Sequence, residues 1–394
     1  MNKKTILVWF RNDLRLWDNE MLSLASEKDN AVLPVFIYDP RLYNETKYGT
    51  RKTGVLRAKF INESVLDLQQ SIRSFNGELI IERGLPEEIL PELAKRYQVD
   101  EVYHHREVAY EETKVSALVE EALWKLKLNL RHFIGHTLYH KEDLPFPIKD
   151  IPDDFNTFKK KASRESSIRP SIRFPENLVF LEIAPEWVVP ELKELGFNDE
   201  EIELTAGSRI IGGETEAKKQ LTLLLSGEVM ESWLSPWISL GCLSVHTYYH
   251  SLISCSGYPK SVLTKLMDEL WWHDYYRFMF KKHGNKFFKL QGFSDTESAY
   301  TGGEHLFERW KSGKTDNEQI NSIIDTLNRT GYISHAERTE AAAFLVNELR
   351  VSWLKGAAYF EEKLIDYNPA TNYGNWAHIA GVGSSFKHNL KKIS

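Results

Sequence analysis

The stretch that decides the fold is TILVWFRNDLRLWDN, residues 5–19, an apolar run that ends in a charged turn. Its first six residues are β-branched, aromatic or aliphatic, as in a buried strand. Similar short runs recur downstream: AVLPVFIYD (31–39), GELIIE (77–82), DEVYHH (100–105) and NLRHFIG (129–135). The N-terminal part therefore contains about five strands, as expected for an α/β domain.

Segments with helical spacing of apolar residues separate these runs, notably 51–74 and 86–98. Repeated strand–helix order predicts a doubly wound parallel sheet with crossover helices, which we assign to residues 1–135. No G-x-G-x-x-G follows the first strand, so a dinucleotide fingerprint is absent. Instead Arg11, Asp13 and Arg15 follow it, and we expect these three side chains to form an ion-paired turn.

The pattern changes beyond the predicted sheet. Residues 136–205 are rich in Pro and charge with little periodicity, which predicts an interdomain connector. From residue 206 to 394 strand signals disappear, and we expect a larger all-α domain. Its helical spacing is clearest at 214–226, 261–283, 317–329, 336–350 and 355–365.

Composition narrows the function classes. The 394 residues carry a net charge of −6, so any DNA contact must use a local basic patch. Aromatic residues make up 12% of the chain, which indicates a site for a flat ligand or a Trp-rich core. Two cysteines, no visible signal peptide and no apolar stretch of membrane length predict a cytoplasmic protein that does not contact membranes.

One predicted helix combines aromatic and ionisable side chains: ELWWHDYYRFMFKKHGNKFF, residues 269–288. Glu269 and Trp272 share an aromatic face, whereas His273, Arg277 and Lys281 form a polar edge. An amphipathic core helix explains most of this pattern. A carboxylate on an aromatic face needs a partner, however, which indicates a pocket.

The segment 330–376 is a second candidate region. Arg338 and Asp366 are placed to pair across a helix–helix junction, either as a structural ion pair or with both charges partly available to a ligand. Trp353 and Trp376 are core residues or redox-active ones. The following stretch NPATNYGNWAHIAGVG (368–383) contains six Asn or Gly residues, so we expect an amide-rich loop rather than a helix.

The stretch SWLSPWISLGCLS (232–244) is typical of a helix start, with Ser235 as N-cap and Pro236 at the first helical position. Free N–H groups there would suit a phosphate. The sequence contains no P-loop, no H-E-x-x-H, no zinc spacing and no G-x-S-x-G, so we predict no metal site.

Three of these segments together resemble the photolyase/cryptochrome flavoproteins: VWFRNDLRLWDN, ELWWHDYYRFMFKKHGNKFF and LIDYNPATNYGNWAHIAGVG. The connector and SPWISLGCLS look most like the DASH-type cryptochromes. The resemblance covers nearly the whole chain. It implies an N-terminal antenna domain, a helical domain that binds FAD, a folate as a further antenna cofactor, and light-driven repair of pyrimidine dimers in single-stranded DNA by a monomer.

The resemblance also implies roles for individual residues. Glu269 and Trp272 match the residues that hold the dimer, and Trp376 and Trp353 match an electron-transfer chain whose third, surface member is Tyr300 or Trp310. The remaining matches concern cofactors: Asn372 beside flavin N5, Asp366 and Arg338 as the flavin-side ion pair, Ser232 and Ser235 at the phosphates, His273, His335 and Asn368 at positions facing the flavin or its phosphates, and Glu111 at the folate.

The sequence departs from the family pattern around the expected cavity. The segment between Leu225 and Ser232 is about ten residues shorter than usual, and His273, His335 and Asn368 replace other polar residues. Thr339 and His378 also differ from the usual side chains. Three functions therefore stay open: a DASH-type photolyase, a photoreceptor without repair activity, and a flavin-free descendant that binds nucleic acid.

Overall fold

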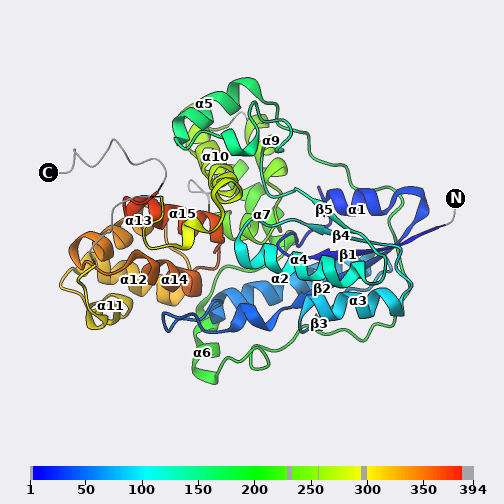
Figure 1. The fold of residues 1–394 in the computed structure, drawn as a ribbon, viewed down its shortest axis with the longest axis horizontal. Helices are drawn as coiled ribbons and strands as arrows, with labels where there is room; N and C mark the ends of the chain where they lie inside the picture. Colours follow the sequence, from blue (N-terminus) through cyan, green and yellow to red (C-terminus); the bar gives the residue numbers. More distant parts are fainter. Residues whose placement is uncertain (1–2, 229–232, 256, 294–299, 384–394) are drawn as a thin grey trace.

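A computed structural model describes residues 3–228, 233–255, 257–293 and 300–383. Its N-terminal domain is built on a parallel sheet with strand order β3-β2-β1-β4-β5, and β6 pairs with β2 outside this path (Figure 1). The strands are β1 (Thr5–Phe10), β2 (Ala31–Tyr38), β3 (Ile80–Arg83), β4 (Glu101–His105), β5 (Leu130–Phe133) and β6 (Val179–Phe180). The predicted doubly wound sheet is confirmed.

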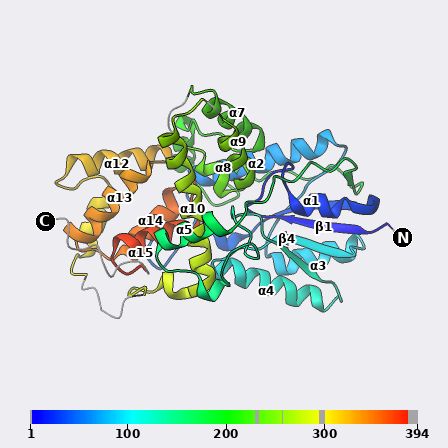
Figure 2. The ribbon, with the colours of Figure 1, turned by 90° about the horizontal axis from the view of Figure 1, so that it is seen from above.

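Helices cover both faces of this sheet, as Figure 2 shows. Ile6, Val8 and Phe10 of β1 pack toward one face, whereas Leu7 and Trp9 pack toward the other. This alternation follows from the two-residue period of a strand. The first face is covered by α1 (Glu20–Ala25) and α2 (Val55–Ser74), and the second by α3 (Pro86–Arg96) and α4 (Tyr110–Trp124).

The turn after β1 differs from its prediction. Asp13 accepts a hydrogen bond from the Arg11 backbone N–H at 2.6 Å, and its second oxygen pairs with His105 Nδ1 at 2.7 Å. The Arg15 guanidinium instead donates to the carbonyl oxygens of Asp18 and Gly241. The expected ion-paired turn is therefore wrong, because the buried Asp13 is satisfied by β4 and not by its neighbours in sequence.

The predicted connector contains regular structure. Helix α5 (Phe155–Glu165) buries Phe155, Phe158 and Ala162 along one face, and α6 (Asp199–Glu203) is a short helix further on. Strand β6 extends the sheet beyond β2 at one end. Neither the helices α5 and α6 nor the strand β6 was predicted, and the domain boundaries themselves stay predictions.

The helical domain is confirmed. Its longest helix, α10 (Lys260–His283), packs against α15, α9 and α5 (Figures 1 and 2). The other helices are α7 (Glu214–Leu225), α8 (Ser235–Ser239), α9 (Val245–Ser254), α11 (Glu304–Lys311), α12 (Glu318–Thr330), α13 (His335–Ala343), which continues as a π-helical turn over Phe344–Glu348, α14 (Trp353–Lys363) and α15 (Pro369–Ile379). Short 3₁₀ turns span Glu27–Asp29, Pro40–Tyr43, Ile148–Asp150, Leu204–Gly207 and Gly284–Phe288. No helix in the described part of the chain has the length and apolarity to cross a membrane.

The stretch expected to be a loop is largely the helix α15. Asn368 caps it by accepting hydrogen bonds from the backbone N–H groups of Ala370 and Thr371, and Pro369 fills the first helical position. Gly374 lies against the Tyr276 ring of α10, where there is no room for a Cβ atom. Capping and close helix packing therefore outweigh the weak helix propensity of Asn and Gly.

Helix α10 also docks on the sheet. The reversal of strand order between β1 and β4 creates the crevice in which open α/β sheets usually bind a ligand. Here the crevice takes Arg277 of α10, which pairs with Glu107 beyond β4 at 2.9 Å. Asn12, beyond β1, donates to the same carboxylate at 2.8 Å. Arg277 was predicted on the polar edge of this helix, and the structure shows that it is a buried contact between the domains.

Candidate functional site

The largest group of predicted site residues lines one pocket in the helical domain. The pocket lies between α13, α14 and α15, and the space around it, including its open mouth, measures about 480 Å³. His335, Arg338, Asp366, Asn368, Asn372 and Trp376 line it, together with Thr339, Ala342, Phe360, Leu364, Tyr367, Thr371, Asn375 and Ile379. Six predicted residues, from α13, from the turn before α15 and from α15, are thus brought together.

The charged centre of the pocket is the predicted ion pair. Arg338 Nη2 lies 2.8 Å from Asp366 Oδ2, and Ser235 donates its hydroxyl to the same oxygen at 2.6 Å. The other carboxylate oxygen, Asp366 Oδ1, is buried and has no hydrogen-bond partner among the described residues. An unsatisfied buried carboxylate oxygen is costly, so this atom is available to a donor on a bound molecule.

Local sequence explains where Arg338 points. Ser334 and Glu337 form a reciprocal capping box at the start of α13, which fixes the first turn that carries Arg338. Arg338 Nε also donates to the carbonyl oxygen of Ile333 at 2.9 Å. The guanidinium is therefore oriented by its own helix start before any ligand arrives.

The side-chain amides of Asn372 and Asn368 have different roles. Asn372 is buried and donates from Nδ2 to the carbonyl oxygen of Ala357 in α14 at 3.0 Å. Asn368 lines the pocket but its side-chain oxygen caps α15. One face of α15 presents Asn368, Asn372 and Trp376 to the pocket, and Thr371, Asn375 and Ile379 complete it.

Trp376 is buried in the pocket wall beside other rings. Its indole lies 5.0 Å from the Phe360 ring and 6.3 Å from the Trp310 ring, both edge-on. Trp353 is completely buried, donates to the Leu290 carbonyl oxygen and does not line the pocket. Trp310 is also fully buried, so it does not fit a surface position, whereas Tyr300 is half-buried.

Glu269 and Trp272 lie outside this pocket, on α10. Trp272 stacks on Phe155 of α5 with ring centroids 3.6 Å apart and an interplanar angle of 9°. His378 of α15 meets its edge at 6.1 Å. One face of the indole is therefore covered by the connector helix, an arrangement that the sequence analysis did not predict.

The Glu269 side chain reaches solvent, but surrounding protein still displaces part of its hydration. This partial burial raises the pKa of Glu269 to about 7, although Lys265 and Arg338 favour the charged form. The carboxyl is therefore partly protonated near neutral pH and can donate as well as accept a hydrogen bond.

We expect the Glu269 carboxyl to hold its proton at pH 6 and to lose most of it by pH 8.5. The protonated-carboxyl band in the infrared spectrum should decrease between the two pH values. This decrease should be larger in the wild type than in Glu269→Gln. Burial raises the pKa of Glu112 to about 8, so part of the band should remain in the variant. Identical difference spectra would contradict the assignment.

Three further predicted residues do not line the pocket or lie outside the described chain. His273 is held beside the fully buried Asp274 at 3.8 Å and does not line the pocket. Ser235 is the first residue of the five-residue α8 and not its N-cap, which is Leu234. Its predicted capping role is wrong because its hydroxyl bonds Asp366. Ser232 lies outside the described residues.

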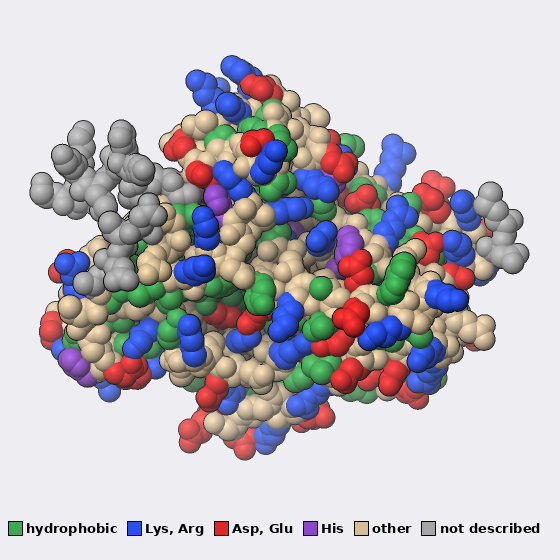
Figure 3. Space-filling model, viewed as in Figure 1, with side chains coloured by type: hydrophobic (Ala, Val, Ile, Leu, Met, Phe, Trp, Pro, Cys, Tyr) green, Lys and Arg blue, Asp and Glu red, His purple; other side chains and the backbone are tan. Residues whose placement is uncertain are grey.

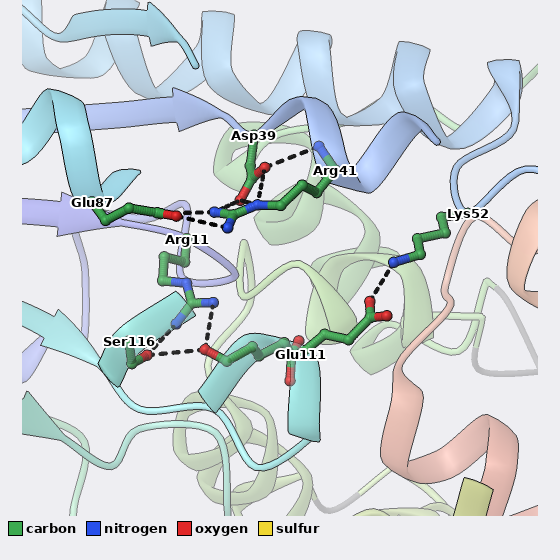
Figure 4. A network of polar contacts seen from close by, with 8 residues as sticks. Arg11, Asp39, Arg41, Lys52, Glu87, Glu111 and Ser116 are labelled. Carbon is green, nitrogen blue, oxygen red and sulfur yellow. Dashed lines mark hydrogen bonds and ion pairs between the residues drawn. The ribbon is translucent and has the colours of Figure 1, made fainter. Parts of the chain in front are cut away.

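Glu111, the residue predicted to bind a folate, lies at the start of α4, in the first helical turn. Its side chain is 64% exposed and pairs with Lys52, as Figure 4 shows. The same view shows Arg41 between Asp39 and Glu87, beyond the end of β2. A second pocket lies near there, lined by Tyr38, Pro40, Tyr43, Asn44, Arg83 and Leu195.

The sequence analysis missed three of the residues on the pocket face of α15: Thr371, Asn375 and Ile379. The signal was present, because positions 368, 371, 372, 375, 376 and 379 follow the helical i, i+3, i+4 spacing. Reading the stretch as a loop concealed it. No group of His, Cys, Asp and Glu with metal-binding geometry is present among the residues that the structure describes.

Comparisons with known proteins show the family of the chain. Residues 6–176 match the DNA photolyase family and residues 266–392 match the FAD binding domain of DNA photolyase. Cryptochrome DASH of Gloeobacter violaceus is 36% identical over 98% of this chain and 80% of its own length. Cryptochrome DASH of Arabidopsis thaliana, a chloroplastic/mitochondrial protein, is 35% identical over 97% of this chain and 71% of its own length.

Solved structures show the same fold. The cryptochrome of Synechocystis sp. PCC6803 superposes with a TM-score of 0.89 at 33% identity, covering 97% of this chain and 83% of that one. A class III photolyase from Agrobacterium tumefaciens has a TM-score of 0.84 at 22% identity, covering 98% of this chain and 81% of that one. With an α/β domain, a helical FAD-binding domain and these relatives, the chain belongs to the DNA photolyase/cryptochrome family and is similar to its DASH cryptochromes.

Proposed function

We propose that this protein is a blue-light-dependent flavoprotein that repairs cyclobutane pyrimidine dimers in single-stranded DNA. The observation that carries the proposal is the pocket in which Arg338, Asp366, Asn372 and Trp376 converge. A charge pair, a buried amide and an indole in one pocket suit a flat ring with polar edges, such as an isoalloxazine. We infer that the protein acts in the cytoplasm as a monomer.

The residues present fit a bound FAD. The buried Asp366 Oδ1 lacks a donor among the described residues, and a ring N–H would satisfy it. Asn372 is fixed by its bond to Ala357, so its amide does not need to be ordered when the cofactor binds. Arg338 places a positive charge 2.8 Å from the other oxygen of the Asp366 carboxylate.

When bound and reduced, the flavin supplies the light-driven one-electron chemistry. The protein's part is to position the flavin and the substrate and to exclude water from the pocket. Trp376 closes the inner wall with only 2% of its surface exposed, and Gly356 allows this because a Cβ there would collide with the indole. Glu269, with a pKa of about 7, is suited to hold a base by hydrogen bonds on the α10 side.

A photoreceptor without repair activity is the second candidate function. It is favoured by the Trp272 indole, one face of which is already stacked on Phe155. His378, at 6.1 Å, narrows the same region. If these contacts persist when DNA binds, Phe155 and His378 block the position in which a base would stack on Trp272. The flavin pocket and Trp376 are not affected by this block.

One preparation tests these functions. The absorption spectrum of fresh protein should show flavin bands, and reduced, FAD-loaded protein under blue light should remove dimers from a single-stranded oligonucleotide. Flavin bands without dimer loss would favour the photoreceptor. Colourless protein that also refuses added FAD would contradict both functions and leave a nucleic-acid-binding descendant.

We also propose a folate antenna at the edge of the sheet domain. Its support is Glu111, whose exposed carboxylate is accessible to a ligand if Lys52 moves aside. Added methenyltetrahydrofolate should bind to the wild type with a near-ultraviolet absorption band and bind less to Glu111→Gln. Equal binding by both proteins would place the antenna elsewhere.

A further inference from the structure

Part of the connector carries a strong local positive charge. Residues 155–173 contain six Lys or Arg and one Glu, a net charge of +5, whereas the whole protein has −6. An isolated run of this kind is usually a solvated helix face. Where it lies beside a binding site, it raises the local concentration of a polyanion.

Helix α5 concentrates this charge on one side. Phe155, Phe158 and Ala162 are buried, while Lys160, Lys161 and Arg164 are exposed. Figure 3 shows Lys and Arg side chains gathered over α5 at the top of the molecule. Arg164 pairs with its neighbour Glu165, but within the described chain no acidic partner is recorded for Lys160 or Lys161.

Two side chains of α5, Phe155 and Lys159, fix it against the aromatic end of α10. Phe155 stacks on Trp272 at 3.6 Å, and Lys159 pairs with Asp268 while its ammonium lies 4.7 Å from the Trp271 ring. Lys161 is six residues after Phe155, which is about 9 Å along the helix axis. The free lysines are therefore within one or two nucleotides of the candidate base position.

We propose that α5 binds the phosphates of single-stranded nucleic acid. Lys160 and Lys161 contact the phosphate backbone, and Phe155 is a positioning residue that lies behind Trp272. The choice of nucleic acid as the polyanion rests on the proposed function. The surface itself rests on the charge, the exposure and the contact with α10. The proposed binding surface therefore includes a helix of the connector as well as the helical domain.

The expected salt dependence follows from counterion release. Each phosphate contact on a single strand contributes about 0.7 to the slope of log K against log salt, or about fivefold in affinity at 0.1 M. Removing two contacts should reduce the slope by about 1.4 and the affinity about 25-fold. The non-electrostatic part of binding should not change.

The test measures the fluorescence anisotropy of a labelled dT16 oligonucleotide between 50 and 300 mM NaCl. Lys160→Gln/Lys161→Gln should show the reduced slope and the 25-fold loss. The control Lys125→Gln/Lys127→Gln, at the end of α4 on the sheet domain, removes the same charge and should stay within about twofold of the wild type. Equal losses in both double variants would overturn the proposal.

A second arm separates Phe155 from the lysines. Phe155→Leu should weaken dT16 binding by about fivefold or more, the low end of the contribution of one stacked base, with an unchanged salt slope. Phe155→Tyr should restore the affinity. If the leucine variant does not fold, the tyrosine variant and the lysine pair still decide, and wild-type affinity for Phe155→Leu would overturn the positioning role.

Two outcomes separate this inference from the proposed flavin function and from a membrane-binding role for α5. Because dT16 binding needs no flavin, colourless protein that binds dT16 through Lys160 and Lys161 would support the surface even if the photochemistry fails. If Lys160→Gln/Lys161→Gln keeps dT16 binding but loses binding to phosphatidylserine vesicles, α5 is a membrane-facing edge and the proposal is overturned.

Discussion

Arg338→Leu is expected to lower the affinity for FAD by at least about a hundredfold, the equivalent of about 3 kcal/mol. Asp366, with 2% of its side chain exposed, would then keep only the Ser235 hydroxyl as a partner. Leaving a buried carboxylate without its cation costs about 3–5 kcal/mol, so the pocket is expected to reorganise in the variant. Equilibrium dialysis against FAD, followed by absorbance, measures the effect.

The matched control is Arg329→Leu. Arg329 pairs with Asp325 on α12 at the same 2.8 Å, but both side chains are more than 60% exposed. Exposed pairs contribute only about 0–1 kcal/mol, so FAD affinity should stay within a few-fold of the wild type. Unchanged affinity in Arg338→Leu would show that the pair is structural only and would remove the main support for the flavin site.

Glu107→Ala is expected to destabilise the protein by about 3–5 kcal/mol. Glu107 and Arg277 are almost completely buried, and Asn12 completes the carboxylate's hydrogen bonds. Removing the carboxylate leaves a guanidinium between the two domains whose Nε already has no partner among the described residues. Urea unfolding, followed by tryptophan fluorescence, should show a lower midpoint or separate transitions for the two domains.

The pH dependence of Glu107→Gln provides an independent check. Burial opposes ionisation of Glu107, but the neighbouring His136 and the permanently charged Arg277 and Arg11 hold its pKa below the ordinary range. A lowered carboxyl pKa gives stability that is present above the unfolded pKa near 4 and lost as the pH falls below it. The wild type should therefore lose more stability than Glu107→Gln between pH 7 and pH 3.

A control and a double variant sharpen this result. Asp325→Ala removes an exposed carboxylate and should change the free energy of unfolding by less than about 1 kcal/mol. Glu107→Met/Arg277→Met removes both buried charges and should recover much of the loss. If Glu107→Ala is no less stable than Asp325→Ala, the contact does not hold the domains together.

The sheet could be predicted because each strand is a local pattern. Runs such as 31–39 are β-rich, bounded by turn residues and separated by helical spacing. The tail was mispredicted for a related reason: Asn and Gly are turn formers locally, but Asn368 is a cap and Gly374 fits against Tyr276. A two-residue strand such as β6 has too short a pattern to detect.

Part of the candidate site was also accessible from the sequence. Arg338 and Asp366 stand at helix ends, where a junction pair is foreseeable, and the family resemblance added Asn372 and Trp376. The contacts of Phe155 with Trp272 and of Glu107 with Arg277 join segments 117 and 170 residues apart in the numbering. No local pattern specifies such pairs, because they depend on how α10 packs on its neighbours.

The position of Arg277 has a consequence for protein engineering. Since a side chain from the second half fills the crevice of the sheet, the two halves are not interchangeable modules. A chimera that grafts this sheet onto a foreign helical half must bring a cation at the equivalent of 277, or the Glu107 carboxylate is stranded at the graft boundary. Recombination between relatives should therefore succeed only when both positions are inherited together.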